Sequence, residues 1–206
     1  MRAAVKVINE RSYALATMTE IAAQLDLRDA TLYYYFPSKQ ALALACHVRS
    51  LELFERLLID ADRSETTGLM KLTQFIRRML EDADHHGPQL YFGDYTYLDA
   101  DDRLQIGSWA ARLTAVLEGF LVDGMADGSV ITCEPPVVVQ LLLGMLIWLA
   151  KWVPSIEGMT VDRLMASIGV ASLAGLARPS PNASEQPDGA RVRSNPAAAL
   201  PQVESR

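Results

Sequence analysis

The chain has 206 residues, of which 50% are hydrophobic, 21% charged and 7% aromatic, and its formal net charge is −6. That length suits one large domain or two small ones with a sizeable apolar core. Two cysteines are too few for a disulfide framework, and no basic segment followed by an apolar one opens the sequence. We therefore expect a reduced, intracellular protein of the cytoplasm. The acidic total argues against a phosphate-rich partner, because phosphate contacts need a surplus of Lys and Arg.

The charge is distributed unevenly along the chain. Residues 1–49 hold six basic and four acidic side chains and carry +2, whereas the remainder carries −8. The N-terminal quarter is therefore mildly basic, and the acidity belongs to the larger part that follows. This distribution leaves a nucleic-acid partner open for the first 49 residues.

Apolar residues recur at three- and four-residue steps in most of the chain, which is the period of an α-helix. No segment alternates with period two between hairpin turn signals, so the predicted class is all-α. Prolines separate the periodic stretches, because proline disfavours helix at the preceding residue. The predicted helices cover residues 2–11, 18–25, 29–36, 38–62, 66–86, 88–94, 101–127, 135–153 and 160–177.

The most informative stretch is residues 17–42, TMTEIAAQLDLRDATLYYYFPSKQAL. Thr17 suits the N-cap of a short helix that turns Ile21 and Ala22 inward. A break of three residues then leads into a second short helix bearing Leu32 and Phe36. Two short helices joined by a tight turn form a helix-turn-helix, whose second helix enters the major groove of DNA.

At these residues the chain resembles the TetR family of bacterial transcriptional regulators. The family pattern is a Thr, an Ile-Ala pair, a turn, Thr-Leu-Tyr, a Phe, Ser-Lys and a Leu. The matching positions are Thr17, Ile21, Ala22, Thr31, Leu32, Tyr33, Phe36, Ser38, Lys39 and Leu42. The resemblance rests on motif over residues 3–49, and elsewhere on length and helical architecture. It implies a helix-turn-helix domain at 1–49 and a ligand-binding and dimerisation domain at 50–178.

The motif region supplies the predicted contacts with double-stranded DNA. Hydroxyls of Thr31 and Tyr33 can donate to phosphate oxygens, and Lys39 adds a positive charge beside a helix N-terminus. Arg28 can make a bidentate contact with guanine. The predicted DNA-binding residues are Thr17, Arg28, Asp29, Ala30, Thr31, Tyr33, Tyr34, Tyr35 and Lys39. The alternative for the three adjacent tyrosines is ordinary packing of half-buried side chains.

The motif departs from the family pattern in three respects. The turn reads Asp26-Leu27-Arg28 where the family commonly has Gly-Val-Ser, and Asp adopts left-handed turn conformations more readily than most residues. Loss of the serine removes the usual cap of the recognition helix, and we expect Asp26 or Asp29 to replace it. The lead before the first helix is short, so either the native start lies upstream or contacts from a basic arm are absent.

The region after the motif suits a small hydrophobic or aromatic effector. Aromatic side chains gather in a short segment between helices and on the helices that flank it, as in an apolar cavity with few polar groups. The predicted ligand-binding residues are Tyr91, Phe92, Tyr95, Trp109, Arg112, Met145 and Trp148. The alternative is that the apolar members fill the core and that Arg112 is solvated.

The last two long helices are predicted to pair with their copies in a homodimer. Residues 135–153 and 160–177 are rich in aliphatic and small side chains, and by resemblance they form a four-helix interface. A two-fold dimer places its recognition helices about one helical turn, roughly 34 Å, apart on a palindromic operator. The apolar run at 137–153 is too short and too polar for a membrane span, so no membrane partner is expected.

Other chemistry finds little support in the sequence. The run EDADHH at 81–86 has i,i+4 spacings that can bind a metal, but His near a helix end is favourable for ordinary reasons. Glycine-rich phosphate loops, nucleophile elbows and CxxC motifs are absent, so neither an enzyme nor a cofactor is expected. Residues 179–206 are rich in Pro, Ser and Ala and are predicted to be disordered.

Two functions from different classes remain open at this point. The first is a ligand-responsive transcriptional regulator, most simply a repressor that a small hydrophobic ligand releases from a palindromic operator. The second is a helical protein that binds a small molecule or a metal and does not bind DNA.

Overall fold

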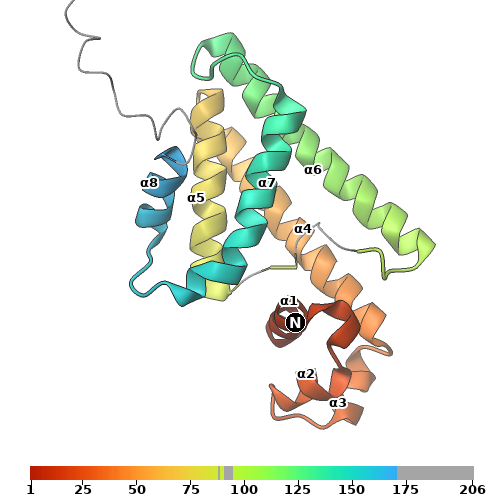
Figure 1. Ribbon diagram of the computed structural model, residues 1–206. Coiled ribbons are helices and arrows are strands. Elements are labelled where there is room, and N and C mark those ends of the chain that lie inside the picture. The colour runs from red at the N-terminus through yellow and green to blue at the C-terminus, as the bar shows by residue number, and fades with distance from the viewer. Residues whose placement is uncertain (88, 91–94, 171–206) are drawn as a thin grey trace, which may run out of the picture. The chain divides into compact units, whose positions relative to one another are not determined.

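The computed structural model describes residues 1–87, 89–90 and 95–170 (Figure 1). The described helices are α1 (Arg2–Leu15), α2 (Met18–Ala23), α3 (Asp29–Tyr35), α4 (Lys39–Ser64), α5 (Gly68–His86), α6 (Ala100–Asp127), α7 (Pro135–Trp152), η1 (Val153–Ser155) and α8 (Val161–Val170). No strand occurs in these ranges, which confirms the all-α prediction. Contacts divide the chain into two units, Met1–Ser167 and Ile168–Arg206. All contacts described below lie within the first unit.

Several helix ends differ from the prediction. The first helix continues past residue 11 to Leu15, across a kink at Ser12 where φ is 72°. The second ends at Ala23, because the backbone N–H groups of Leu25 and Leu27 turn back to the carbonyl of Ala22. The predicted helix at 88–94 lies mostly outside the described residues, as does the predicted tail at 179–206.

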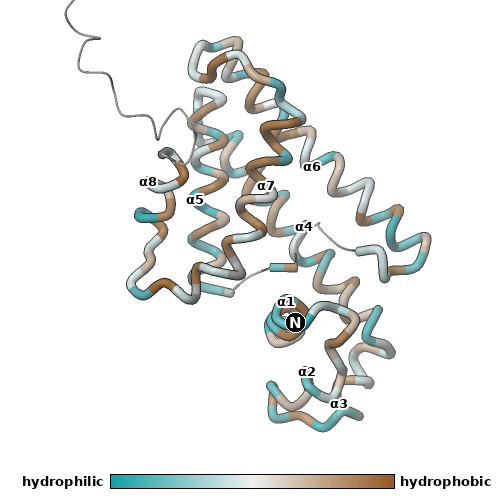
Figure 2. The backbone as a smooth tube through the Cα atoms, viewed as in Figure 1, coloured by the Kyte–Doolittle hydropathy of each residue, from teal (hydrophilic) through white to brown (hydrophobic). Residues whose placement is uncertain are grey.

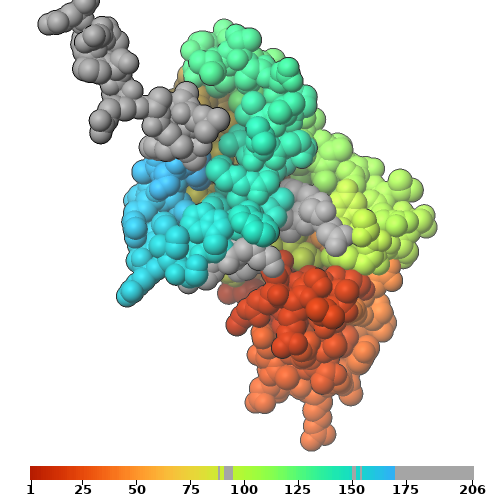
Figure 3. All heavy atoms as spheres, viewed as in Figure 1, coloured from red at the N-terminus to blue at the C-terminus, as the bar shows by residue number. Residues whose placement is uncertain are grey.

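The first four helices share one hydrophobic core. Apolar side chains of α1, α2, α3 and the start of α4 are buried together; they include Val5, Ile8, Ile21, Leu32 and Leu42. Each such side chain contributes roughly 1.5–3 kcal/mol when it leaves water. Leu90, which follows α5 in the sequence, is buried in the same core. The side chains of this region form one red and orange surface in Figure 3.

Helix α4 is common to the helix-turn-helix and to the helices that follow. It runs without a break from Lys39 to Ser64, so the predicted domain boundary at residue 49 falls inside it. Its later turns pack against α5 and α6, with the rings of Phe54 and Phe75 4.7 Å apart. Movement of α5 against α4 can therefore reach the start of the same helix, next to the recognition helix.

Helix α7 is apolar around most of its circumference, as the hydropathy colouring in Figure 2 shows. One face is buried against its neighbours through Val139, Leu143, Leu146 and Leu149. The opposite face is exposed, with residues at i, i+4, i+7 and i+11, namely Val137, Leu141, Gly144 and Trp148. Among the described helices, none has both the length and the hydropathy that a membrane crossing requires.

Candidate DNA-binding and effector sites

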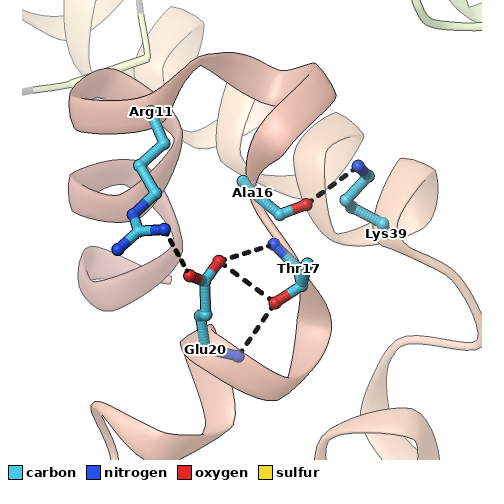
Figure 4. A network of polar contacts seen from close by, with 5 residues as sticks. All are labelled: Arg11, Ala16, Thr17, Glu20 and Lys39. Carbon is cyan, nitrogen blue, oxygen red and sulfur yellow. Dashed lines mark hydrogen bonds and ion pairs between the residues drawn. The ribbon is translucent and has the colours of Figure 1, made fainter.

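Helix α2 is fixed by a capping box. The Thr17 hydroxyl accepts a hydrogen bond from the Glu20 backbone N–H at 3.2 Å, and the Glu20 carboxylate accepts from the Thr17 N–H at 3.2 Å (Figure 4). The same carboxylate pairs with Arg11 of α1 at 2.7 Å. Thr17 was expected at the DNA surface as well as at the N-cap. The structure confirms the capping role of its hydroxyl and leaves DNA contact as a prediction.

The turn between α2 and α3 takes a left-handed residue where glycine is usual. Asp26 has a φ of 55°, in the region that Asp reaches more easily than most side chains. The expected replacement cap is not formed: Arg28 is the N-cap residue of α3, and no side chain caps the helix. Instead, the Asp29 carboxylate accepts a hydrogen bond from the Thr19 hydroxyl of α2 at 2.5 Å. This hydrogen bond connects α2 to α3. It also occupies a carboxylate oxygen of Asp29, which was predicted to contact DNA bases.

The remaining side chains predicted on the recognition helix are exposed. Tyr33, Tyr34 and Tyr35 are 47%, 84% and 67% exposed, and the rings of the last two meet edge to face at 5.2 Å. Core packing therefore does not account for Tyr34 and Tyr35. Arg28, Ala30 and Thr31 are exposed as well. The exposed part of α3 thus presents hydroxyls, aromatic rings and one guanidinium on a short helix, a set that suits phosphate and base edges.

Lys39 has a different role from the one expected. Its ammonium donates a hydrogen bond to the Ala16 carbonyl at 2.9 Å (Figure 4). The same ammonium donates to the carbonyls of Tyr13 at 2.9 Å and Ala14 at 3.5 Å. It also lies 4.4 Å from the centre of the Tyr13 ring. An ammonium has three hydrogens, and all three are engaged. Lys39 therefore joins α4 to the end of α1, and its contact with phosphate stays a prediction.

A buried polar contact links the segment before α6 to the helix-turn-helix. His47 of α4 is 1% exposed, and its Nε2 lies 2.7 Å from the hydroxyl of Tyr97. The Tyr97 ring stacks on that of Tyr13 with centroids 3.6 Å apart. One weak signal for this contact is visible in the sequence: His47 is a lone histidine on the apolar face of the predicted helix 38–62. Its partner comes from a distant segment and could not be identified.

The segment after α5 is bonded to the same region. Asn9 of α1 donates to the Gln89 carbonyl at 3.1 Å, and the Leu90 N–H donates to the Ser50 hydroxyl at 3.1 Å. The Gln89 side chain in turn donates to Asp82 of α5 at 3.1 Å. The end of α5 is therefore connected to both α1 and α4 by hydrogen bonds.

None of the residues that were predicted to bind an effector and that the structure describes lines the cavity among α5, α7 and α8. Tyr91 and Phe92 lie outside the described residues. Tyr95, Trp109 and Met145 are half-buried, and the Trp109 indole N–H is buried with no hydrogen-bond partner in the described part of the chain. Arg112 is exposed on α6, as its solvated alternative requires. Trp148 is 63% exposed, because it lies on the outer face of α7.

A cavity of about 350 Å³ lies instead among α5, α7 and α8. This volume is within the range of small-molecule sites. Its lining is mainly aliphatic and sulfur-containing: Met79, Leu80, Ala83, Asp84, Leu146, Leu149, Val153, Ile156, Gly158, Met159, Thr160, Val161 and Leu164. The sequence placed several of these residues on apolar helix stripes. It could not distinguish a stripe that faces a cavity from one that fills the core.

The titratable side chains outside the cavity have local roles. His85 contacts the Glu81 carbonyl at 2.7 Å and His86 contacts the Asp82 carboxylate at 2.8 Å, and the described residues contain no group of three metal ligands.

Cys46 is buried, and this burial raises the pKa of its thiol to about 11. Cys133 lies half-buried in the non-helical segment before α7.

Comparisons with known proteins agree with this architecture. The Fatty acid metabolism regulator protein of Bacillus subtilis is 24% identical over 130 residues, which are 62% of this chain and 67% of that protein. A crystal structure of AibR with isovaleryl coenzyme A and operator DNA is 20% identical, with a TM-score of 0.69 over 81% of this chain and 92% of that chain. The regulator FadR from Bacillus subtilis with stearoyl-CoA is 23% identical, with a TM-score of 0.57 over 81% and 91%. These structural likenesses concern the fold.

Two family models together match most of the chain. Residues 1–46 match the bacterial regulatory proteins of the tetR family, and residues 65–173 match the tetracyclin repressor-like C-terminal domain. The first match covers α1 to α3 and the start of α4, where the exposed tyrosines lie. The second begins just before α5 and covers the cavity. The chain therefore belongs to the tetR family of bacterial regulatory proteins.

Proposed function

We propose that the protein is a repressor that binds a palindromic operator as a homodimer and leaves it when a small hydrophobic ligand binds. The observation that carries the proposal is the exposed face of α3 with Tyr33, Tyr34 and Tyr35, in a helix-turn-helix whose first helix, α2, has a capping box. Core packing does not account for the rings of Tyr34 and Tyr35, and the hydroxyls of all three tyrosines suit phosphate oxygens. DNA as the partner implies action in the cytoplasm.

The dimer interface is assigned to the exposed face of α7, formed by Val137, Leu141, Gly144 and Trp148, together with α8. The spacing of these four α7 residues puts them in one stripe along the helix. Exposure of such an apolar stripe to water is unfavourable, and it usually marks a surface that binds another molecule. A second copy related by a two-fold axis would bury the stripe against itself. The same axis would give two recognition helices for two half-sites.

The effector is assigned to the cavity among α5, α7 and α8. Its apolar lining suits an aliphatic group, and two regulators with this fold carry acyl coenzyme A thioesters in their structures. We therefore take an acyl or alkyl group as the part of the ligand that fills the cavity. Tyr95 and Trp109 remain candidates for a second part of the effector site.

The contacts support a route from the cavity to DNA. Met79, Leu80 and Ala83 of α5 line the cavity, and Asp82 beside them holds Gln89. Gln89 and Leu90 are bonded to α1 and α4. A ligand that displaces the end of α5 would therefore displace these two helices in each protomer and change the separation of the recognition helices.

The proposal is tested by selecting binding sites from random double-stranded DNA with the full chain at moderate salt. We expect enrichment of one palindromic sequence with half-sites about one helical turn apart. The matched control is the variant in which Tyr33, Tyr34 and Tyr35 are all replaced by Ala, which should enrich no sequence while remaining folded. Failure of the wild-type protein to enrich any palindrome would refute the repressor function.

A further inference from the structure

The wall of the cavity among α5, α7 and α8 contains one charged side chain among its described residues. This is Asp84, which is exposed at the edge of the apolar lining. It makes no hydrogen bond or ion pair with any described residue. The other side chain with a polar group is Thr160, whose hydroxyl accepts from the Arg163 backbone N–H at 3.2 Å.

The neighbouring cations are engaged elsewhere. Arg77 pairs with Asp162 at 2.6 Å, and Arg163 donates to the carbonyl of Gly158. Arg78 lies 3.7 Å from Glu81 on the same helix. Arg163 forms no ion pair with a described residue, but it does not itself line the cavity. Among the described lining residues, an anionic group would therefore meet the Asp84 carboxylate and no cation.

We propose that this cavity selects apolar molecules by the charge of their polar end: it takes an alkyl or acyl chain that ends in a cation or a hydrogen-bond donor, and it excludes the free carboxylate. Opposite charges attract and like charges repel across a partly hydrated site. Among the described residues that line the cavity, Asp84 is the one charged side chain. The apolar lining supplies affinity that is independent of the head group.

This selectivity separates two sources of the same acyl group. A free fatty acid brings a negative charge to Asp84, whereas an acyl thioester has no charge at that end of its chain. An alkyl amine brings a cation. The interpretation of this preference as effector recognition rests on the proposed function. The binding preference itself is a property of the chain and is measured without DNA.

The test uses three probes with the same ten-carbon chain: decylamine, 1-decanol and decanoate. Their binding to the full chain is measured by isothermal titration calorimetry at pH 7.5, below the concentration at which each probe aggregates. We expect decylamine to bind at least about tenfold more tightly than decanoate, with decanol between them. Equal affinities for the amine and the carboxylate, or no binding of any probe, would overturn the proposal.

Three variants locate the effect. Asp84→Asn should bring the three affinities together, mainly by improving decanoate, whereas Glu52→Gln on the exposed side of α4 should leave the wild-type order intact. Ala83→Phe should abolish binding of all three probes by filling the cavity, with the fold checked by circular dichroism. An amine preference that survives in Asp84→Asn, or binding that survives in Ala83→Phe, would contradict the assignment. Because no DNA is present, these results are independent of the repressor function.

Discussion

Lys39 uses its charge within the protein, although its position in the motif predicts a phosphate contact. Its three carbonyl partners lie near the end of α1 and in Ala16, the residue that follows α1, and its own position is the first of α4. The side chain thus holds together the elements on either side of the recognition helix. Sequence alone could not show this, because carbonyl groups are present at every position and their orientation follows from the kink at Ser12.

Replacement of Lys39 by Met should destabilise the protein. Loss of the charged donor leaves three carbonyls without their partner, and a cost of about 1–3 kcal/mol is expected. Urea unfolding followed by circular dichroism measures this change, and Lys6→Met, on the exposed side of α1, is the control with the same loss of charge. The phosphate role would instead be supported if Lys39→Met left the stability unchanged. The salt dependence of its DNA binding would then correspond to about one phosphate contact fewer.

Burial of Cys46 gives the protein a pH dependence at the alkaline end. Because burial raises the pKa of this thiol from 9.0 to about 11, the folded state holds the thiol proton more tightly than the unfolded state does. The corresponding stability is present below pH 9 and is lost as the pH rises towards 11. At pH 8 a thiol reagent should therefore modify Cys133 alone in the folded chain and both cysteines in urea. Equal rates for the two would contradict the buried position of Cys46.

At the scale of the helices, the spacing of apolar residues predicted most helices. It did not show which face of α7 is buried. The amphipathic α5 has an apolar stripe that its sequence shows directly, and its observed start and end agree closely with the predicted 66–86. Helix α7 is apolar on nearly all sides, so its sequence does not indicate which face is buried. The prediction therefore put Trp148 in the ligand site, whereas Leu146 and Leu149 on the inner face line the cavity.

The crossing of α5 and α6 depends on a glycine at the start of α5. A Cβ atom added to Gly68 would overlap the carbonyl oxygen of Phe120 and the backbone of Gly124. Gly68→Ala should therefore separate the two helices and cost about 1–3 kcal/mol of unfolding free energy.

The matched control for this crossing is Gly119→Ala on α6, where an added Cβ meets nothing within 4 Å. Helix propensity favours that change, so a gain of about 0.5–1 kcal/mol is expected. The two variants are compared by urea unfolding. Similar stabilities for both would show that the close approach at Gly68 is not required.

At the scale of the whole molecule, the proposed dimer would explain how an acidic chain can bind DNA. One copy presents a local surplus of only +2 over residues 1–49, which gives weak electrostatic attraction to DNA. Two linked copies on one palindrome double the number of DNA contacts. Once the first copy is bound, the second binds without a further loss of translational and rotational freedom. The sequence showed the charge distribution and the family motif. It could not show which side of α7 is free to pair.

Leu141→Glu should convert the dimer to a monomer. Leu141 is 69% exposed at the centre of the α7 stripe, so the substitution leaves the fold of one copy intact but places two carboxylates across the two-fold axis. Light scattering after size exclusion measures the mass, and Leu104→Glu, which replaces another leucine that is 69% exposed, is the control on α6. A dimer that persists in Leu141→Glu would place the interface elsewhere.

The most direct test of the central claim is the affinity of the full chain for its selected palindrome. Fluorescence anisotropy at fixed salt should give binding at least about a hundredfold tighter to that palindrome than to a scrambled duplex. The Tyr33, Tyr34 and Tyr35 to Ala variant should lose this preference while unfolding at the same urea concentration as wild type. Equal binding of the wild-type protein to both duplexes, or an unchanged preference in the variant, would contradict recognition of DNA by α3.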